Sequence, residues 1–104
     1  MIARLLLVLA LLIVPPVHAA GEPVIVVVGD SISAGYGLAP GQVWVALLEA
    51  RLKAERFPHR VINASISGDT TAGGRTRLPA LLAAHKPAVV VIELGGNDAL
   101  RGLP

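Results

Sequence analysis

Apolar residues lie along this chain in two patterns, continuous runs and helical stripes, which predict the order strand, helix, strand, helix, strand. Val24–Val28 is an unbroken β-branched run, typical of a strand that is buried on both faces. Shorter runs at Val61–Asn63 and Ala88–Leu94 predict a second and a third strand. Between the strands, residues 42–55 and 75–85 carry apolar side chains at helical spacing and predict two helices.

The apolar stripes of the two helices identify the side chains that we expect to face the sheet. In the first helix they are Val43, Leu47, Leu48 and Leu52. In the second helix they are Leu78, Leu81 and Leu82. Pro79 is expected near the first turn of the second helix, where a missing N–H costs little. Residues 29–41 and 64–74 are expected to be loops.

Strands that alternate with helices indicate an α/β domain with a doubly wound parallel sheet. Because crossovers between parallel strands are right-handed, we expect the helices to pack on the sheet. The loops that follow the three strands begin at Gly29, Ala64 and Gly95, and they should share one edge of that sheet. The third strand would have an unpaired apolar edge, so we expect the chain to be an amino-terminal fragment.

Residues 1–19 have the features of a signal peptide. Met1–Arg4 is a short positive segment, and Leu5–Val14 is an unbroken apolar segment. The prolines that follow lead to a small-residue processing site, with cleavage expected after Ala19 or Ala20. The apolar segment is too short to cross a bilayer, which disfavours an uncleaved anchor. We therefore expect an exported protein, in the periplasm or the medium.

Composition narrows the class of domain that residues 20–104 can form. The leader inflates both the 54% hydrophobic content and the mean hydropathy of +0.69, so neither value indicates a membrane protein. The formal charge of +2 comes from scattered basic residues, which do not support binding to nucleic acid. The absence of cysteine excludes a thiolate nucleophile and a zinc–thiolate site, and leaves core packing alone to hold an exported domain together.

Small polar clusters follow all three predicted strands, at the edge where open α/β sheets bind their ligands. These clusters are Gly29-Asp30-Ser31, Asn63 to Thr70, and Gly95-Gly96-Asn97-Asp98. Acyl transfer to a serine requires a hydroxyl, a base and hydrogen-bond donors for the oxyanion. Ser31 can supply the hydroxyl. Its own backbone N–H, the backbone N–H of Gly68 and the side-chain amide of Asn97 can supply the donors.

Each of these residues also has a purely structural interpretation. A serine after a strand is often a helix cap, and Gly-Asn-Asp and Gly-Asp are common turn compositions. Gly29 can be explained by the turn alone, because chain reversal after a buried strand needs the conformational freedom of glycine. Asp30 and Asp98 are expected to hold loop geometry, and Tyr36 and Leu38 to line an acyl site.

Other functional motifs fail on their spacing. The glycines from Gly35 to Gly41 are spread one residue too widely for the dinucleotide-binding fingerprint. Gly74 stands where a phosphate-binding loop beginning at Gly68 needs its lysine. Ser31 lacks the second glycine of the nucleophile elbow. Neither a cofactor nor a metal site is predicted.

The three clusters together carry a family resemblance. Gly-Asp-Ser-Ile-Ser-Ala-Gly-Tyr, Asn-Ala-Ser-Ile-Ser-Gly-Asp-Thr and Glu-Leu-Gly-Gly-Asn-Asp, in this order and spacing, resemble the first three blocks of the SGNH (GDSL) hydrolases, closest to the exported bacterial thioesterase, lysophospholipase and arylesterase branch. The resemblance implies a flavodoxin-like three-layer α/β/α fold, of which this chain holds the first β-α-β-α-β portion. It implies Ser31 as nucleophile, with Gly68 and Asn97 in the oxyanion hole. Ile32 replaces the usual leucine, which changes an apolar contact.

The family's catalytic base is a histidine in a late Asp-x-x-His block, which these 104 residues do not contain. His59 and His85 each precede a strand and are expected at the opposite edge of the sheet from Ser31. A five-residue strand spans about 17 Å, whereas a base must come within about 3 Å of the proton that it takes. We therefore expect the catalytic Asp and His to lie beyond Pro104, and the fragment itself to be inactive.

The sequence thus predicts a serine hydrolase that cleaves a small carboxylic ester or thioester through an acyl-enzyme on Ser31. Two alternatives stay open. One is a carbohydrate O-acetyl esterase of the same fold, and the other is a non-catalytic binding domain if the chain is complete.

Overall fold

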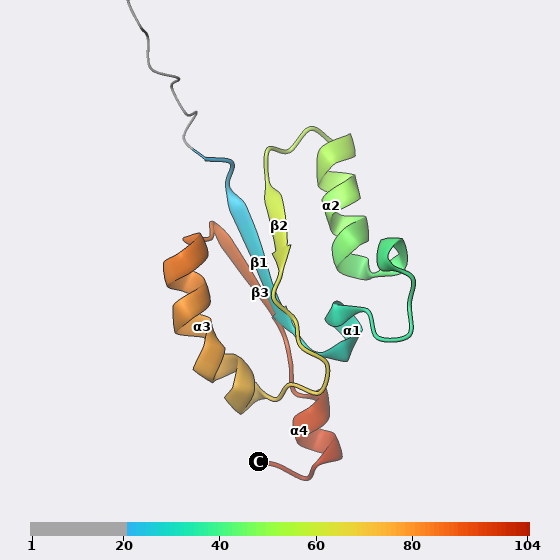
Figure 1. The fold of residues 1–104 in the computed structure, drawn as a ribbon, viewed down its shortest axis with the longest axis vertical. Helices are drawn as coiled ribbons and strands as arrows, with labels where there is room; N and C mark the ends of the chain where they lie inside the picture. Colours follow the sequence, from blue (N-terminus) through green and yellow to red (C-terminus); the bar gives the residue numbers. More distant parts are fainter. Residues whose placement is uncertain (1–20) are drawn as a thin grey trace, which may run out of the picture.

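A computed structural model describes residues 21–104 as three parallel strands with helices on both sides (Figure 1). The predicted signal peptide at residues 1–19 lies outside the described residues. The strands are β1 (Val24–Gly29), β2 (Arg60–Asn63) and β3 (Val89–Glu93). The helices are α1 (Ser31–Ala34), α2 (Trp44–Ala54), α3 (Thr71–His85) and α4 (Gly96–Leu100), with a 3-10 turn at Pro40–Gln42. The predicted α/β class is confirmed.

β1 is the central strand, in the order β2-β1-β3. Val24 pairs with Arg60 at one end of the sheet, and Gly29 pairs with Glu93 at the other. All six residues of β1 are buried, which explains the continuous apolar run in the sequence. The second crossover returns past β1, so right-handed connections place α2 and α3 on opposite faces of the sheet (Figure 1). The order in which strands are added to the sheet thereby reverses, since β2 lies on one side of β1 and β3 on the other. Open α/β sheets bind ligands at such a switch point.

Two hydrophobic cores cover the two faces of β1. On the α3 side, Val26 and Val28 pack with Leu78 and Leu81. On the α2 side, the core residues are Val27, Val43, Val45, Trp44, Val61 and Val91. The sequence prediction for α2 was partly wrong, because Leu47 is 56% exposed and Val45 is buried instead. On α3, Leu82 is likewise exposed. The apolar edge of β3 is open in residues 21–104, with Ile92 60% exposed.

Helix α3 begins at Thr71, four residues before the predicted start at Arg75. Thr70 caps it by accepting a hydrogen bond from the backbone N–H of Gly73. Gly74 is buried within the helix and in close contact with Leu94, so that a side chain at this position would collide with it. The glycine therefore allows close packing and does not mark a loop. Pro79 consequently lies inside the helix, not in its first turn.

The predicted loop at residues 29–41 contains the short helix α1 and the 3-10 turn. The expectation for Gly29 was wrong in its physical reason, since Gly29 is not among the glycines with positive φ. A Cβ at this position would lie 2.6 Å from Ser33 Oγ and 3.0 Å from Glu93 Oε1. Gly29 therefore makes room for those two side chains, and its conformational freedom is not used. Among residues 21–104, no helix is both long enough and apolar enough to span a membrane.

Candidate active site

Ser31 is the first residue of α1, directly beyond the carboxyl end of the central strand. The preceding Asp30 is only 3% exposed, and its carboxylate accepts a 3.0 Å hydrogen bond from the backbone N–H of Ile32. Asp30 thus caps α1 and fixes the turn, as expected for a residue that holds loop geometry. Ser31 is half-buried, and its hydroxyl makes no hydrogen bond with any residue in the described range 21–104.

Gly68 lies in a tight turn that follows β2. The turn is closed by a 3.1 Å hydrogen bond from Asp69 N–H to the carbonyl of Ile66, and Gly68 has φ +82°. Only glycine adopts this conformation readily, so the turn itself requires the residue. Ile66 N–H also donates to the carbonyl of Gly29 over 3.0 Å, which ties the turn to the end of β1.

Two side chains of the α4 segment hold this turn from the other side. The Asn97 amide donates to the carbonyl of Asp69 over 2.9 Å, and Arg101 donates to the carbonyl of Gly68 over 2.9 Å. An amide nitrogen carries two hydrogens, so Asn97 keeps a second donor after making this bond. The structure therefore brings Asn97 of α4 against the turn that contains Gly68, and both are predicted site residues.

The third loop completes the convergence at this edge of the sheet. Gly96, at the start of α4, lies beside Asp30, because a Cβ on Gly96 would be 3.7 Å from Asp30 Oδ2. The segments that carry Ser31, Gly68 and Asn97 therefore meet at the carboxyl ends of β1, β2 and β3, as the parallel topology predicted. All three loops lie at the lower end of the sheet in the view of Figure 1.

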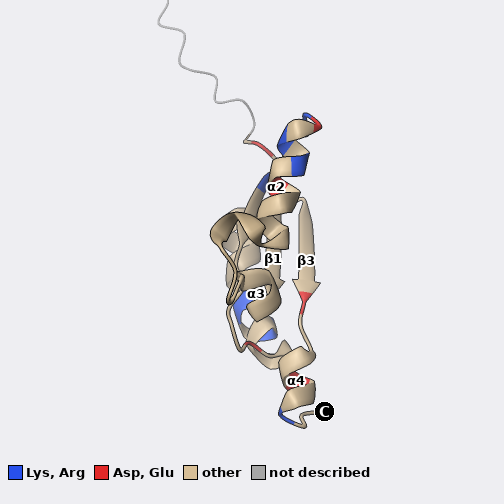
Figure 2. Cartoon of the chain, turned by 90° about the vertical axis from the view of Figure 1, so that its right-hand side faces the viewer, with Lys and Arg blue, Asp and Glu red and all other residues tan. Residues whose placement is uncertain are grey.

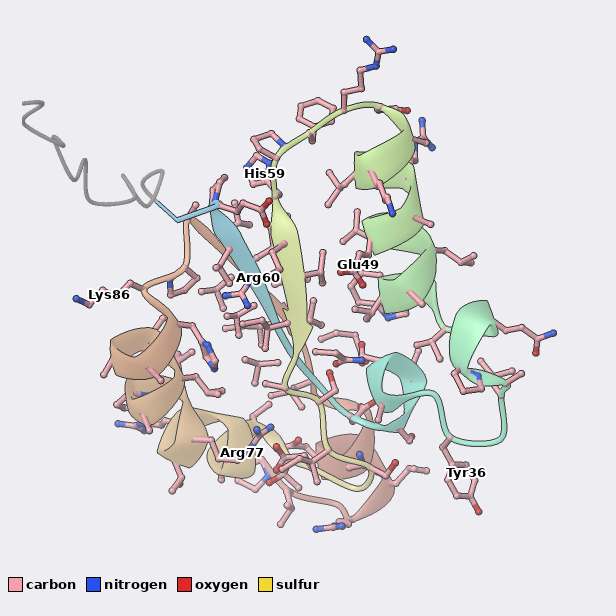
Figure 3. All side chains as sticks on the ribbon, turned by 45° about the horizontal axis from the view of Figure 1, so that its top comes forward. Tyr36, Glu49, His59, Arg60, Arg77 and Lys86 are labelled. Atoms are coloured by element: carbon pink, nitrogen blue, oxygen red, sulfur yellow. The ribbon has the colours of Figure 1, made fainter. Side chains whose placement is uncertain are left out.

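The loop that carries Gly68 is anchored to α3 by an ion pair. Arg77 Nη2 lies 2.7 Å from Asp69 Oδ2, and both side chains are largely buried. Arg77 also donates to the carbonyl of Ala64 over 2.7 Å and so ties both ends of the loop to α3. Figure 3 shows Arg77 pointing from α3 toward this loop. The spacing of these residues alone did not indicate this contact.

Asp98 fastens α4 to the start of α3. Its carboxylate accepts hydrogen bonds from the Thr71 hydroxyl at 2.6 Å and from the Thr71 backbone N–H at 2.9 Å. The hydrogen bond from the Thr71 hydroxyl is the largest cause that holds the pKa of Asp98 below its usual value, and the bond from the Thr71 backbone N–H is the next. The positive charge of Arg101 acts in the same direction. Asp98 therefore holds loop geometry, as expected from the sequence.

A buried polar cluster beneath Ser31 was not predicted. Ser33 is fully buried, donates to Glu93 Oε1 at 2.7 Å and accepts from Trp44 Nε1 at 2.9 Å. Asn63 donates to the backbone carbonyl of Ser33 over 2.7 Å. One sequence signal could have indicated this cluster, namely the single charged residue, Glu93, at the end of the apolar run that forms β3. Figure 2 shows this acidic position at the tip of β3.

The histidines lie where the sequence placed them, away from Ser31. His59 directly precedes β2, at the end of the sheet where Val24 pairs with Arg60, and His85 ends α3. In Figure 3, His59 lies at the end of the sheet opposite the loop that carries Tyr36. Across the length of β1 this separation is about 17 Å. Neither imidazole can take a proton from Ser31 in this structure.

The two residues expected to line an acyl site differ in their surroundings. Tyr36 is 82% exposed and points outward (Figure 3). Leu38 lines a cleft of about 310 Å³ between α1, α2 and β2. Within residues 21–104, no group of three or more His, Asp and Glu residues is arranged to hold a metal ion.

Comparisons with known proteins identify the family of the chain. Residues 27–104 match the model of the GDSL-like Lipase/Acylhydrolase family. The chain is 66% identical over 84 residues to Esterase TesA of Pseudomonas aeruginosa. The aligned residues make up 81% of this chain and 42% of that protein. It is 48% identical over 85 residues to an Escherichia coli protein named as a thioesterase, protease and lysophospholipase. That alignment covers 82% of this chain and 39% of the Escherichia coli protein.

A solved structure shares the fold. The esterase EstA of a Pseudoalteromonas species, inhibited by monoethylphosphonate, aligns with a TM-score of 0.73 and 48% identity over 80% of this chain and 45% of that one. The chain spans about two fifths of the length of the curated relatives described above, at 42% and 39%. The family model covers well over half of the chain, in the segment that holds all three loops. The chain therefore belongs to the GDSL-like lipase/acylhydrolase family.

Proposed function

We propose that the protein of which this chain forms part is an exported serine hydrolase, with Ser31 as the nucleophile that attacks a carboxylic ester or thioester. The observation that carries the proposal is the convergence of three loops on one edge of the sheet. The loop after β1 carries Ser31, whose hydroxyl makes no hydrogen bond within residues 21–104. The loop after β2 carries Gly68, and the Asn97 amide, which follows β3, donates a hydrogen bond to that loop. Two similar proteins carry the names esterase and thioesterase, which supports the same reaction class.

In the first half of the reaction, Ser31 Oγ forms a bond to the carbonyl carbon and its proton passes to a base. The carbonyl electron pair moves onto oxygen, where hydrogen-bond donors stabilise the charge. We assign the donors to the backbone N–H groups of Ser31 and Gly68 and the second N–H of Asn97. Neither of the two backbone N–H groups donates a hydrogen bond to another residue in the range 21–104, so both are available.

In the second half, the oxyanion collapses and the bond to the leaving alcohol or thiol breaks, with the base returning the proton to the leaving group. The ester that remains on Ser31 is the acyl-enzyme. Water then attacks it with the help of the same base and releases the acid. Because His59 and His85 lie at the far end of the sheet and His18 falls in the predicted signal peptide, we assign the base to a histidine outside residues 1–104.

A phosphonate probe tests this assignment directly, because it phosphonylates an activated serine and stays attached. The complete protein should react at Ser31, and peptide mapping by mass spectrometry should locate the adduct there. Ser31→Ala should abolish both labelling and the hydrolysis of p-nitrophenyl esters. Ser65→Ala, which removes another loop hydroxyl, is the matched control and should label normally. Labelling that survives Ser31→Ala would refute the assignment.

A substrate panel distinguishes the proposed activity from its two alternatives. Turnover of acyl thioesters and aryl esters is expected. Release of acetate from acetylated oligosaccharides alone would favour the carbohydrate esterase. A properly folded complete protein that neither reacts with the probe nor turns over any ester would indicate a binding domain.

Export is tested by locating the mature protein after cell fractionation and sequencing its amino terminus.

A further inference from the structure

The turn that carries Ser31 is supported from below by a buried side chain of the same short helix. Ser33 is 0% exposed although it lies only two residues from the half-buried Ser31. α1 has only four residues, from Ser31 to Ala34, so its own backbone bonds fix its orientation weakly. The contacts of Ser33 are therefore a main constraint on where Ser31 points.

The chemistry of the three groups fixes the direction of both hydrogen bonds. The Trp44 indole can only donate, so Ser33 Oγ accepts from it at 2.9 Å. The single hydroxyl hydrogen of Ser33 is then directed to Glu93 Oε1, which accepts it at 2.7 Å. The chain Trp44 to Ser33 to Glu93 thus joins α2, α1 and the end of β3.

The surrounding packing leaves little freedom for this chain of bonds. Gly29 brings the backbone of β1 so close that an added Cβ would lie 2.6 Å from Ser33 Oγ and 3.0 Å from Glu93 Oε1. Asn63 at the end of β2 also donates to the Ser33 carbonyl over 2.7 Å. Ser33 is therefore held by a side chain from each of the two outer strands, on either side of the strand that leads into Ser31.

We infer that Glu93 is a positioning residue that acts through Ser33 to fix the orientation of Ser31, which bears on catalysis only if Ser31 is the nucleophile proposed above. Glu93 holds Ser33, Ser33 holds α1, and α1 aims the Ser31 hydroxyl. Loss of Glu93 leaves the buried Ser33 hydroxyl without its acceptor, and loss of Ser33 leaves the half-buried Trp44 and Glu93 without their shared partner. Either change releases the helix. Misplacing a nucleophile by a fraction of an ångström to an ångström lowers kcat far more than it changes KM.

Three variants of the complete protein test the inference by their kcat and KM for a p-nitrophenyl ester. Glu93→Leu should lower kcat about 10- to 100-fold with KM little changed. Glu93→Gln retains an acceptor oxygen for the Ser33 hydroxyl and should keep kcat within about threefold. Ser33→Ala should lower kcat about as much as Glu93→Leu. The double variant should be no slower than the slower single variant, because both act on one contact.

A spectroscopic measurement separates positioning from general loss of stability. Trp44 is the single tryptophan among the 104 residues, and its indole N–H resonance, assigned with Trp44→Phe, reports the bond to Ser33. It should shift in Ser33→Ala and Glu93→Leu and stay in place in Thr76→Ala, which removes an exposed hydroxyl on α3. Val26→Ala is the stability control, since it weakens the buried core on the α3 side of the sheet, whereas Trp44 packs in the core on the α2 side.

The outcomes discriminate clearly. The inference is overturned if Glu93→Leu keeps kcat within twofold, if Glu93→Gln loses as much as Glu93→Leu, or if the losses in the double variant multiply. An equal loss in Val26→Ala at matched stability would also overturn it. A wild-type protein that fails to react with the phosphonate at Ser31 would instead refute the proposed function. A reactive wild type with a normal Glu93→Leu variant would refute the positioning role alone.

Discussion

The side-chain amide of Asn97 donates a 2.9 Å hydrogen bond to the backbone carbonyl of Asp69, one residue beyond Gly68. This bond joins the loop after β3 to the loop after β2. It directs one amide hydrogen of Asn97 to the protein, and the same nitrogen carries a second hydrogen. The two residues that the sequence nominated as oxyanion donors are therefore parts of one structural unit, and a change at Asn97 acts on both.

Replacing Asn97 should reduce turnover without abolishing folding. Removal of a side-chain oxyanion donor costs about 10²- to 10³-fold in kcat, and Asn97→Ala should fall in this range. Asn97→Asp should be at least as slow, because a carboxylate cannot donate and its charge opposes the oxyanion. Steady-state kinetics of the complete protein on a p-nitrophenyl ester measure both, with circular dichroism to check folding. If Asn97→Ala kept half of the wild-type kcat, its assigned role would be wrong.

Arg101 offers a milder perturbation of the same turn. Its guanidinium donates to the carbonyl of Gly68 over 2.9 Å, and the residue is exposed. Loss of one such bond corresponds to a few-fold to about tenfold effect, so Arg101→Ala should lower kcat by about that amount. Arg101→Lys should recover part of the loss. A kcat equal to that of wild type in Arg101→Ala would show that the turn is held without Arg101.

The histidines provide a negative prediction. His59→Gln and His85→Gln should each keep kcat within about twofold, because neither imidazole comes within reach of the Ser31 proton. The measurement is kcat of the complete protein across neutral pH, with folding checked for His59, whose Nδ1 is buried without a partner in the described residues. A hundredfold loss in either folded variant would place that histidine in the reaction.

The pattern of apolar residues was enough to predict the three strands and their common edge, since β1 is a continuous apolar run, β3 is one up to Glu93, and β2 contains the shorter run Val61–Ile62. It failed at the start of α3, where Gly73 and Gly74 were interpreted as loop residues. Gly74 is required by the approach of Leu94, and Asp98 binds the first residue of the helix from a point far along the chain. Local propensity carries no information about such long-range contacts.

In the candidate site too, positions set by the strand order could be predicted from the sequence, whereas long-range contacts could not. Ser31, Gly68 and Asn97 were accessible to sequence reasoning because each follows a strand and the topology brings the strand ends together. The supporting contacts were not accessible, because the bond from Ser33 to Glu93 joins residues 60 positions apart. Only the structure reveals which buried partner a polar side chain reaches.

Gly29 yields a prediction about stability. In Gly29→Ala the new methyl group would lie within 2.6 Å of Ser33 Oγ, so the buried polar chain must shift. Such overpacking costs about 1–3 kcal/mol, measured as a fall in the free energy of unfolding in urea. Gly41→Ala is the matched control, because nothing lies within 4 Å of its added Cβ, and it should change stability by about 0.5 kcal/mol or less. Equal effects of the two substitutions would contradict the role of Gly29 as a spacer.

Asp98 should make stability depend on acidic pH. Its pKa in the folded protein lies below the usual 3.8, because the Thr71 hydroxyl and backbone N–H bind the charged carboxylate. The stabilisation is therefore fully present above pH 3.8 and is lost as the pH falls through the lower folded-state pKa. Urea midpoints of wild type and Asp98→Asn should differ at neutral pH and converge as the pH falls below 3.8. Glu55→Gln, in the exposed Arg51–Glu55 pair, should differ little from wild type throughout. A gap between wild type and Asp98→Asn that persists unchanged into strong acid would show that the Asp98 charge does not hold α4 to α3.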